Sequence, residues 1–462
     1  MTLDAVANRK KIEFIQKLKA LEEEFSEWCE MSKEGKPFEK HNTQIRSIQA
    51  HLEPWKKLIT QKLESDEQKE TDKFLKTCKN AESLILSEHR IWDYFRKKFI
   101  QRKNESFNRY LKVADEFAWI CYQPIQLAAN IELKEPPLVF FNGGMSPFSV
   151  SRERTFQTEL VDGEDLSAKI SNKEIIKLPI SVVGIPWDQI NHLAEASVIG
   201  HEVGHIVEND FKLTNDLERL FDEALNEAKA DKSRKEAWHS WRSEIFADFY
   251  GCLSVGAAFA GTMFDYLVDE KQKIEIQIRE SGNWTAYPTN ILRMKIIFKI
   301  LENMGFKDEI KNYAEIYASY SSNMPKDFEA DIDFIAQKLL HGNFISLNNK
   351  AITEIFNFTA DQQEQVVNAT KNIKKNKLTE TVDLNEFDIR VILAATRFSF
   401  EESPKQHIDN NYDDVIINWI ENNILKEGVR FSLITSSPED KLKQYGKVGE
   451  ESITQRIDEY FN

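Results

Sequence analysis

The residues of this sequence whose types and spacing are best suited to chemistry are His201, Glu202 and His205, within the stretch ASVIGHEVGHIVE. On a helix, residues four apart differ by roughly 40° in direction and lie about 6 Å apart along the axis. Both imidazoles can therefore reach one metal ion, and the carboxylate of Glu202 can reach a water on that metal. The spacing predicts a metal-binding helix. The alternative is a buried helix whose two histidines are only hydrogen-bonded.

A catalytic zinc ion usually takes a third protein ligand and keeps one position open. Glu208 lies two turns beyond His201 on the same helix, so it cannot converge with both imidazoles. His239 and Glu244 remain as downstream candidates. Glu244 stands in an apolar stretch, where an unpaired carboxylate is costly and a metal is a suitable partner. We therefore expect Glu244 to be the ligand, with His239 as an alternative ligand or a nearby proton donor.

Asp248 follows Glu244 by one helical turn, and we expect its carboxylate to accept the N–H of a ligand imidazole. Asp248 lies within the apolar run Ile245–Val268, and Glu244 directly precedes it. This run is long enough to cross a bilayer. This run contains Asp248 and Asp265 and has flanks of mixed charge. We therefore expect a buried core helix rather than a membrane span.

The pairing of His201-Glu202-x-x-His205 with Glu244-x-x-x-Asp248 resembles the gluzincin group of zinc metallopeptidases, to which thermolysin belongs. The resemblance implies a zinc (Zn2+) site made by the two histidines and Glu244. It also implies that Glu202 activates water for attack on a peptide bond and that Asp248 orients a ligand histidine.

The elements expected just before the histidine motif include two strands. Leu138–Phe141 is a short apolar run that predicts the first strand. The second is expected at Ile175–Ile185, and its Pro179 and Gly184 suggest an edge strand, since proline cannot donate to a central ladder. The resemblance implies that this edge, Leu178–Ile185, is where an extended peptide substrate lies.

Peptide hydrolysis also needs a group that stabilises the oxyanion, and the resemblance implies a Tyr or His from another helix. Tyr287 is the first candidate, in the segment WTAYPTNILR, which looks like the HPxxxxR segment of some HExxH proteins. Arg293, at the end of that segment, would bind a carboxylate or pair with Asp248. Tyr250 and His239 are alternatives for the oxyanion. In a purely structural interpretation, Tyr287 and Arg293 only pack and cap the next helix.

Helical periodicity predominates on both sides of these strands, with apolar residues at three- and four-residue steps. The charged segment Glu208–Glu236 is expected to be a solvated helix or lid, and the histidine helix is expected to begin near Asp188 or Asn191. The other expected helices are Ile12–Trp28, Ile45–Leu63, Lys73–Leu86, Ser87–Ile120, Ile291–Leu301, Ile332–Leu340 and Phe387–Phe400.

These patterns predict a mainly α fold with a small β-sheet, in which a zincin-like metallopeptidase core is flanked by helical regions. The resemblance covers Leu138–Ile300, about a third of the 462 residues. The expected domains are a helical N-terminal array at 1–134, the catalytic core at 135–300 and a helical C-terminal region at 301–462.

The composition indicates which partners and which cellular compartment to expect. A net charge of −15 disfavours nucleic acid and anionic membrane surfaces as partners. Four widely spaced cysteines without a CxxC pair indicate reduced thiols, and the N-terminus lacks an apolar signal segment. We therefore expect a cytoplasmic protein with no nucleic-acid or membrane partner.

The leading hypothesis is a zinc metallopeptidase that hydrolyses peptide or protein substrates. The GxMEN element of related aminopeptidases is absent from the sequence, which favours an endopeptidase. One alternative is a non-catalytic regulatory or peptide-binding protein derived from a peptidase. The other is a helical scaffold without a metal. The sequence carries no signal for an oligomeric state.

Overall fold

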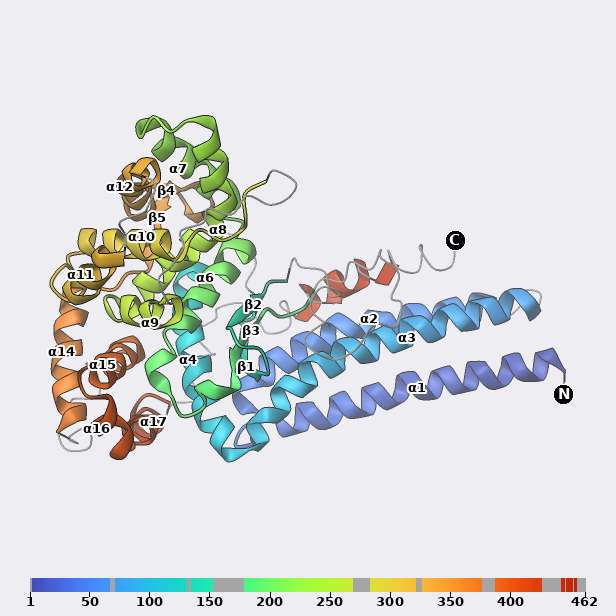
Figure 1. Ribbon diagram of the computed structural model, residues 1–462. Coiled ribbons are helices and arrows are strands. Elements are labelled where there is room, and N and C mark those ends of the chain that lie inside the picture. Colours follow the sequence, from blue (N-terminus) through green and yellow to red (C-terminus); the bar gives the residue numbers. More distant parts are fainter. Residues whose placement is uncertain are drawn as a thin grey trace.

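The computed structural model describes residues 2–66, 71–129, 131, 134–152, 178–268, 283–320, 326–375, 387–425, 442–444, 446–451 and 453–454. Most of these residues are helical, and the described strands form one sheet of three strands and one of two. The predicted mainly α fold with a small β content is confirmed. Three long helices form an extended arm; most of the other elements gather at one end of it, and the short C-terminal helical segment lies along the arm (Figure 1).

The arm consists of α1 (Leu3–Met31), α2 (Asn42–Asp66) and α3 (Thr71–Phe99). Each helix buries one apolar stripe against the other two, because its large apolar residues recur every three or four positions. The boundary that we expected between Leu86 and Ser87 is wrong. Helix α3 runs through it, since Leu84 and Ile91 continue the buried stripe across that point without a helix-breaking residue.

The sheet follows α4 (Glu105–Ala128) and consists of β1 (Leu138–Asn142), β2 (Phe148–Val150) and β3 (Val182–Pro186). The strand order is β1-β3-β2, with β1 parallel and β2 antiparallel to β3.

The expected edge strand at Ile175–Ile185 is therefore corrected, because β3 lies between two neighbours; residues 175–177 are outside the described part. Pro179 precedes β3 and costs it no ladder bond, and its carbonyl accepts a hydrogen bond from Arg152. Gly184 leaves room for the ring of Phe148, which a Cβ would meet at 2.5 Å. Within the described residues, β2 is the edge strand on this side.

The segment between β3 and the C-terminal region holds α6 (Val198–Asp210), α7 (Thr214–Glu227), α8 (Lys232–Val255) and α9 (Ala258–Leu267). Helix α6 starts later than expected, because two short 3-10 turns occupy Trp187–Gln189 and Leu193–Glu195. The segment expected to be a solvated helix or lid is helical, but its central helix, α7, is amphipathic and buries Leu217 and Phe221. The expected single core helix over Ile245–Val268 is broken at Gly256, whose φ of 61° ends α8.

The C-terminal region is helical around a two-stranded sheet. Its elements are α10 (Asn290–Asn303), α11 (Lys311–Tyr320), α12 (Lys326–His341), β4 (Asn343–Phe344), β5 (Lys350–Ala351), α13 (Ile352–Ile355), α14 (Ala360–Lys374), α15 (Ile389–Glu402), α16 (Pro404–Asp409) and α17 (Tyr412–Asn423). The helices expected within α10, α12 and α15 are confirmed.

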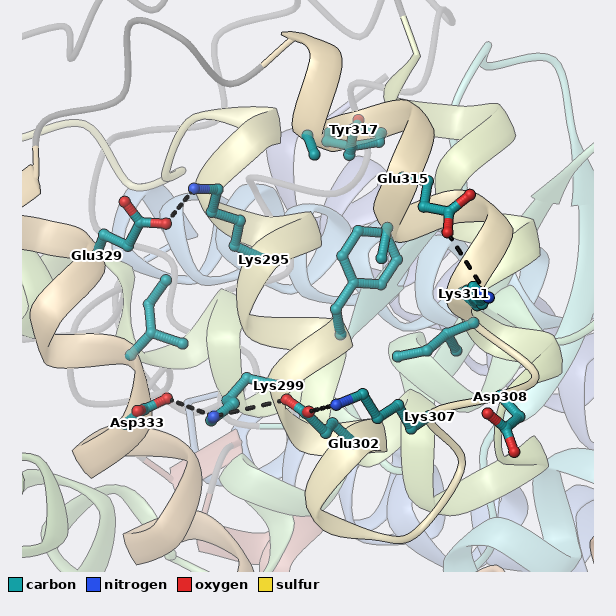
Figure 2. A pocket seen from close by; sticks show the side chains of 15 residues that line it. Lys295, Lys299, Glu302, Lys307, Asp308, Lys311, Glu315, Tyr317, Glu329 and Asp333 are labelled. Atoms are coloured by element: carbon teal, nitrogen blue, oxygen red, sulfur yellow. Dashed lines mark hydrogen bonds and ion pairs between the residues drawn. The ribbon is translucent and has the colours of Figure 1, made fainter.

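Helices α10 and α12 are tied together by ion pairs beside an open cavity of about 790 Å³ (Figure 2). Lys299 pairs with Asp333 at 2.9 Å, and Lys295 pairs with Glu329 one turn earlier. These exposed pairs link α12 to α10, the helix that carries Arg293.

Two hydrophobic cores meet at the three-stranded sheet. In β1, Leu138 and Phe140 belong to the core of the arm, whereas Val139 and Phe141 belong to the larger core formed by α4 and the later helices. Successive side chains of a strand point to opposite faces, so the sheet is buried on both sides. None of the helices in the described part of the chain combines the length and the apolar character needed to cross a membrane.

Candidate metal centre

Helices α6 and α8 cross at unusually short range, because α6 has glycines where they meet. A Cβ on Gly204 would lie 2.8 Å from the Cβ of Tyr250 and 3.1 Å from the Cα of Ala247. A Cβ on Gly200, one turn earlier, would lie 2.3 Å from the Oγ of Ser254. Only glycine permits this approach. It brings the histidines of α6 against the acidic residues of α8.

Three of the predicted site residues converge there. The Nε2 atom of His201 lies 3.5 Å from Oε1 of Glu244, and Nε2 of His205 lies 3.4 Å from Oε2 of the same carboxylate. One ligand atom from each of the three residues lies within 4.8 Å of the other two. The described residues contain no second group of three His, Cys, Asp or Glu side chains so arranged. This group can hold a metal ion.

The geometry and the charge both fit a divalent ion. Ligands placed about 2.0–2.1 Å from a tetrahedral ion lie about 3.3 Å from one another, and each histidine Nε2 lies near that distance from one oxygen of Glu244. Glu202, Glu244 and Asp248 supply three carboxylates near the site, and Arg293 supplies one guanidinium. When both imidazoles are neutral, as metal ligands must be, these three carboxylates outnumber the one guanidinium by two charges, and a divalent cation would balance them.

Asp248 and Arg293 surround the first histidine and the carboxylate ligand. The Nδ1 atom of His201 lies 3.0 Å from Oδ1 of Asp248. Arg293 donates to both oxygens of Asp248, at 2.7 and 2.8 Å, and its Nη1 lies 2.8 Å from Oε1 of Glu244. The expected pairing of Arg293 with Asp248 is present.

These contacts control the protonation of the buried groups. Burial alone would lower the pKa of His201, but contacts with Asp248 and Glu244 outweigh it and raise that pKa to about 10. Burial opposes ionisation of Glu244, yet Arg293 and the two histidines hold its pKa well below the usual range. The metal-free site is therefore a compact network of opposite charges.

The second histidine is held by residues that sequence reasoning missed. Nδ1 of His205 lies 3.2 Å from Oγ of Ser243, and that hydroxyl donates to Oε2 of Glu208 at 2.5 Å. Glu208 was considered only as a direct ligand and rejected as one. Its position three residues after His205, in an apolar helix, was the available signal.

The three ligand candidates line a cavity of about 490 Å³. Glu202 also faces it and is only 6% exposed. Tyr287 stands in the cavity wall but is 66% exposed, so it lies at the mouth. The cavity-lining residues are Ser146, Pro147, Phe148, Ser149, Ser151, Val198, His201, Glu202, His205, Asn209, Ser240, Ser243, Glu244, Met263, Tyr266, Leu267, Ala286, Tyr287 and Arg293.

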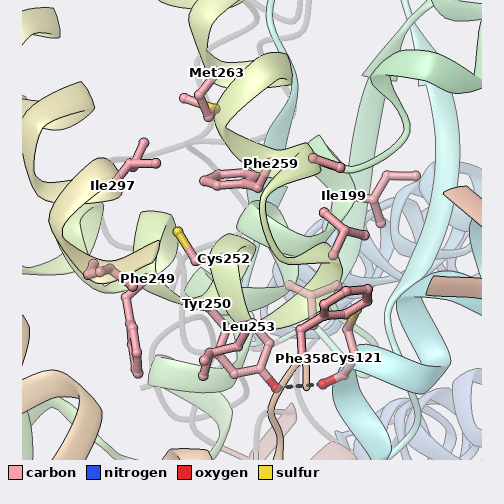
Figure 3. Packing of buried hydrophobic residues seen from close by; sticks show 14 of the residues in the cluster. Cys121, Ile199, Phe249, Tyr250, Cys252, Leu253, Phe259, Met263, Ile297 and Phe358 are labelled. Atoms are coloured by element: carbon pink, nitrogen blue, oxygen red, sulfur yellow. Dashed lines mark hydrogen bonds between the residues drawn. The ribbon is translucent and has the colours of Figure 1, made fainter. Parts of the chain in front are cut away.

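Two alternative candidates are not brought to this cavity. Nε2 of His239 lies 2.9 Å from Oδ1 of Asp222, and the residue does not line the cavity. The hydroxyl of Tyr250 donates to the carbonyl of Cys121 inside the core, as Figure 3 shows. His239 is therefore not a ligand in this structure, and neither side chain is placed to contact a substrate.

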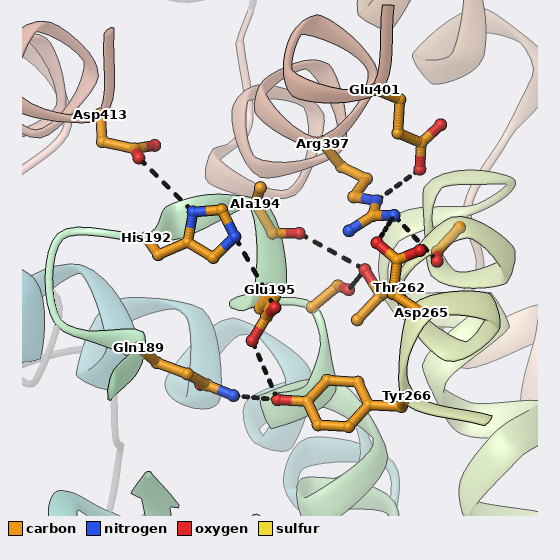
Figure 4. A network of polar contacts seen from close by, with 12 residues as sticks. Gln189, His192, Ala194, Glu195, Thr262, Asp265, Tyr266, Arg397, Glu401 and Asp413 are labelled. Atoms are coloured by element: carbon orange, nitrogen blue, oxygen red, sulfur yellow. Dashed lines mark hydrogen bonds and ion pairs between the residues drawn. The ribbon is translucent and has the colours of Figure 1, made fainter. Parts of the chain in front are cut away.

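Apolar and polar packing fixes the walls around the site. The ring of Phe259, in the core drawn in Figure 3, stacks on the imidazole of His201 with an interplanar angle of 17°. The hydroxyl of Tyr266 contacts Glu195 at 3.1 Å and Gln189 (Figure 4). The ring of Tyr266 is thereby held as one wall of the cavity.

Comparison of the chain with family models, with curated proteins and with solved structures finds no match.

Proposed function

We propose that this chain is a zinc-dependent metallopeptidase of the gluzincin type, an endopeptidase built on a zincin-like core. The observation that carries the proposal is the convergence of His201, His205 and Glu244 beside Glu202 in one cavity. Four ionisable side chains that are largely buried and line one cavity are costly for a purely structural role. Two imidazoles and one carboxylate are a donor set that suits zinc better than magnesium or calcium.

Zinc held by these ligands would act as a Lewis acid and lower the pKa of a water at its open position. The chain supplies the proton transfers. Glu202 follows His201 directly and faces the same cavity, so its carboxylate would accept a proton from the attacking water and pass it to the leaving amine. Asp248 would keep His201 in the orientation that presents Nε2 to the metal.

The position of β2 supports a peptide as the substrate. Phe148 and Ser149 of β2 line the cavity, and β2 is one of the two edge strands of the sheet among the described residues. An extended peptide would pair with this edge through backbone hydrogen bonds and cross in front of the metal ligands. The proposed peptide-binding edge is therefore β2, rather than the strand expected at Leu178–Ile185.

Tyr287 remains our candidate for stabilising the oxyanion. Its ring stands at the mouth of the cavity with most of its surface exposed, so a bound peptide would bury it. A phenol donor at that point would face the carbonyl that becomes negatively charged.

The test is zinc content followed by turnover. The purified chain is expected to contain about one zinc per molecule by elemental analysis, and a Glu244→Ala variant is expected to lose it. Against a library of unstructured peptides, the native chain is expected to cleave internal bonds. A matched Glu202→Gln variant is expected to retain zinc and lose turnover by several orders of magnitude.

The other outcomes would contradict the proposal in different ways. A zinc-loaded chain that cleaves no peptide would support the alternative of a non-catalytic regulatory or peptide-binding protein. A Glu202→Gln variant that still cleaves would refute the role of Glu202. A chain without zinc, even after incubation with the metal, would leave the helical scaffold as the remaining hypothesis.

A further inference from the structure

The two histidines of the site are supported in different ways. His201 has the carboxylate of Asp248 directly beside its Nδ1, at 3.0 Å. His205 has a hydroxyl there instead, because Ser243 precedes Glu244 on α8 and its Oγ lies 3.2 Å from Nδ1 of His205. A carboxylate still stands behind this hydroxyl, since Ser243 donates to Glu208 at 2.5 Å.

The directions of these hydrogen bonds are fixed by chemistry. The carboxylate of Glu208 can only accept, so the Ser243 hydroxyl must donate its single proton to it. The oxygen of Ser243 is then an acceptor toward His205, and Nδ1 of His205 must carry the proton. The lone pair of the neutral ring is consequently on Nε2, the atom that lies 3.4 Å from Glu244.

The buried carboxylate of Glu208 makes few other interactions. It is 3% exposed, and its other oxygen accepts only a long hydrogen bond of 3.3 Å from Thr214. No Lys or Arg side chain in the described part of the chain forms an ion pair with it. A buried carboxylate of this kind is stabilised when it faces, through a hydroxyl, an imidazole that gains positive character.

We infer that Ser243 and Glu208 are positioning residues that orient His205 and select its metal-binding tautomer. The inference rests on the metal site of the proposed function but not on peptide hydrolysis. Partners of this kind typically change metal affinity about 10–100-fold when removed.

The experiment measures zinc affinity by competition with a chromophoric chelator. Ser243→Ala is expected to weaken zinc binding about 10–100-fold, and Glu208→Gln is expected to weaken it less, because the amide oxygen still accepts from Ser243. Ser243→Thr keeps a hydroxyl and is expected to restore most of the affinity. The matched control is Ser240→Ala, whose hydroxyl also lines the cavity but donates to the carbonyl of Thr285 at 2.8 Å.

A structural readout separates positioning from misfolding. The visible spectrum of the cobalt-substituted protein is expected to change in Ser243→Ala and to stay native-like in Ser240→Ala, with both variants folded by circular dichroism. Zinc affinity of Ser243→Ala equal to that of Ser240→Ala would overturn the inference while leaving the metal site intact. Zinc binding without peptide cleavage would overturn only the proposed function, and a native chain that binds no zinc would overturn both.

Discussion

At the scale of single residues, Arg293 is the counterion of the metal-free site. Its guanidinium contacts Glu244 and Asp248, and those contacts raise its own pKa even though burial opposes the charged form. Removing this guanidinium would leave His201 as the remaining cationic partner of both buried carboxylates, and the loss of one partner of a buried ion pair is costly. A divalent metal would supply the missing positive charge.

We therefore predict that Arg293→Met destabilises the metal-free chain by about 3–5 kcal/mol and that zinc restores much of this loss. Chemical denaturation with and without zinc measures both effects. Lys295→Met on the same helix is the control, because it breaks only the pair with the half-exposed Glu329 and is expected to cost about 1 kcal/mol or less. An Arg293→Met variant whose loss is the same with and without zinc would contradict the shared role.

How much of the site the sequence predicts depends on the kind of signal. His201, His205 and Glu244 were predicted because ligand chemistry restricts both residue type and helical spacing. His239 and Tyr250 do not line the cavity. They were predicted as alternatives because the sequence alone did not show which side chains of α8 face the site. Ser243 and Glu208 were not predicted, because residues that hydrogen-bond to a ligand ring occur at no fixed spacing in the sequence.

At the scale of elements, the site depends on how closely α6 and α8 pack. Gly204 leaves no room for a Cβ against Tyr250 and the backbone of Ala247. Because Ala247 offers backbone rather than a flexible side-chain end, an added methyl group must push the helices apart. The separations between Glu244 and the two histidines would grow with that movement.

We predict that Gly204→Ala destabilises the fold by about 1–3 kcal/mol and weakens zinc binding by more than tenfold. Thermal unfolding and chelator competition measure the two effects. Gly143→Ala, in the turn after β1, is the control, since its Cβ would meet no atom within 4 Å. Native zinc affinity in Gly204→Ala would show that the helix spacing does not set the ligand geometry.

The element boundaries that the sequence did not predict share one physical cause. Apolar periodicity reports burial, but it does not report where a buried helix stops. The run Ile245–Val268 is predominantly apolar on both sides of Gly256, so the break there leaves no change in the apolar pattern. The edge strand was predicted from Pro179 and Gly184, but Pro179 lies before β3 and Gly184 makes room for Phe148 from the neighbouring strand.

At the scale of the whole molecule, the arm has a hydrophobic core of its own, joined to the larger core through the sheet. This arm core contains an acid. Glu88 of α3 is 3% exposed, and its Oε2 has no hydrogen-bond partner among the described residues. Burial raises its pKa to about 8, and the nearby Lys56 only partly offsets that effect.

The sign of the pH dependence follows from this raised pKa. Below pH 4.5 Glu88 is protonated in the folded and the unfolded chain, so it does not disfavour folding. Above that pH the unfolded chain releases the proton while the folded chain retains it, and stability falls until the pH reaches about 8. Glu88→Gln cannot ionise, so we predict that it stabilises the arm by up to about 3 kcal/mol at pH 7 and leaves stability unchanged at pH 4.

Denaturant unfolding of the full chain at several pH values, followed by the fluorescence of the arm tryptophans Trp55 and Trp92, measures this difference. Glu82→Gln on the same helix is the control, because Glu82 is half-exposed beside Lys17 and is expected to show no such pH-dependent gain. If the stability difference between Glu88→Gln and the native chain stays constant from pH 4 to pH 8, the ionisation of Glu88 does not oppose folding. A difference that grows from pH 4.5 to pH 8 would show that the buried carboxyl of Glu88 weakens the arm at neutral pH.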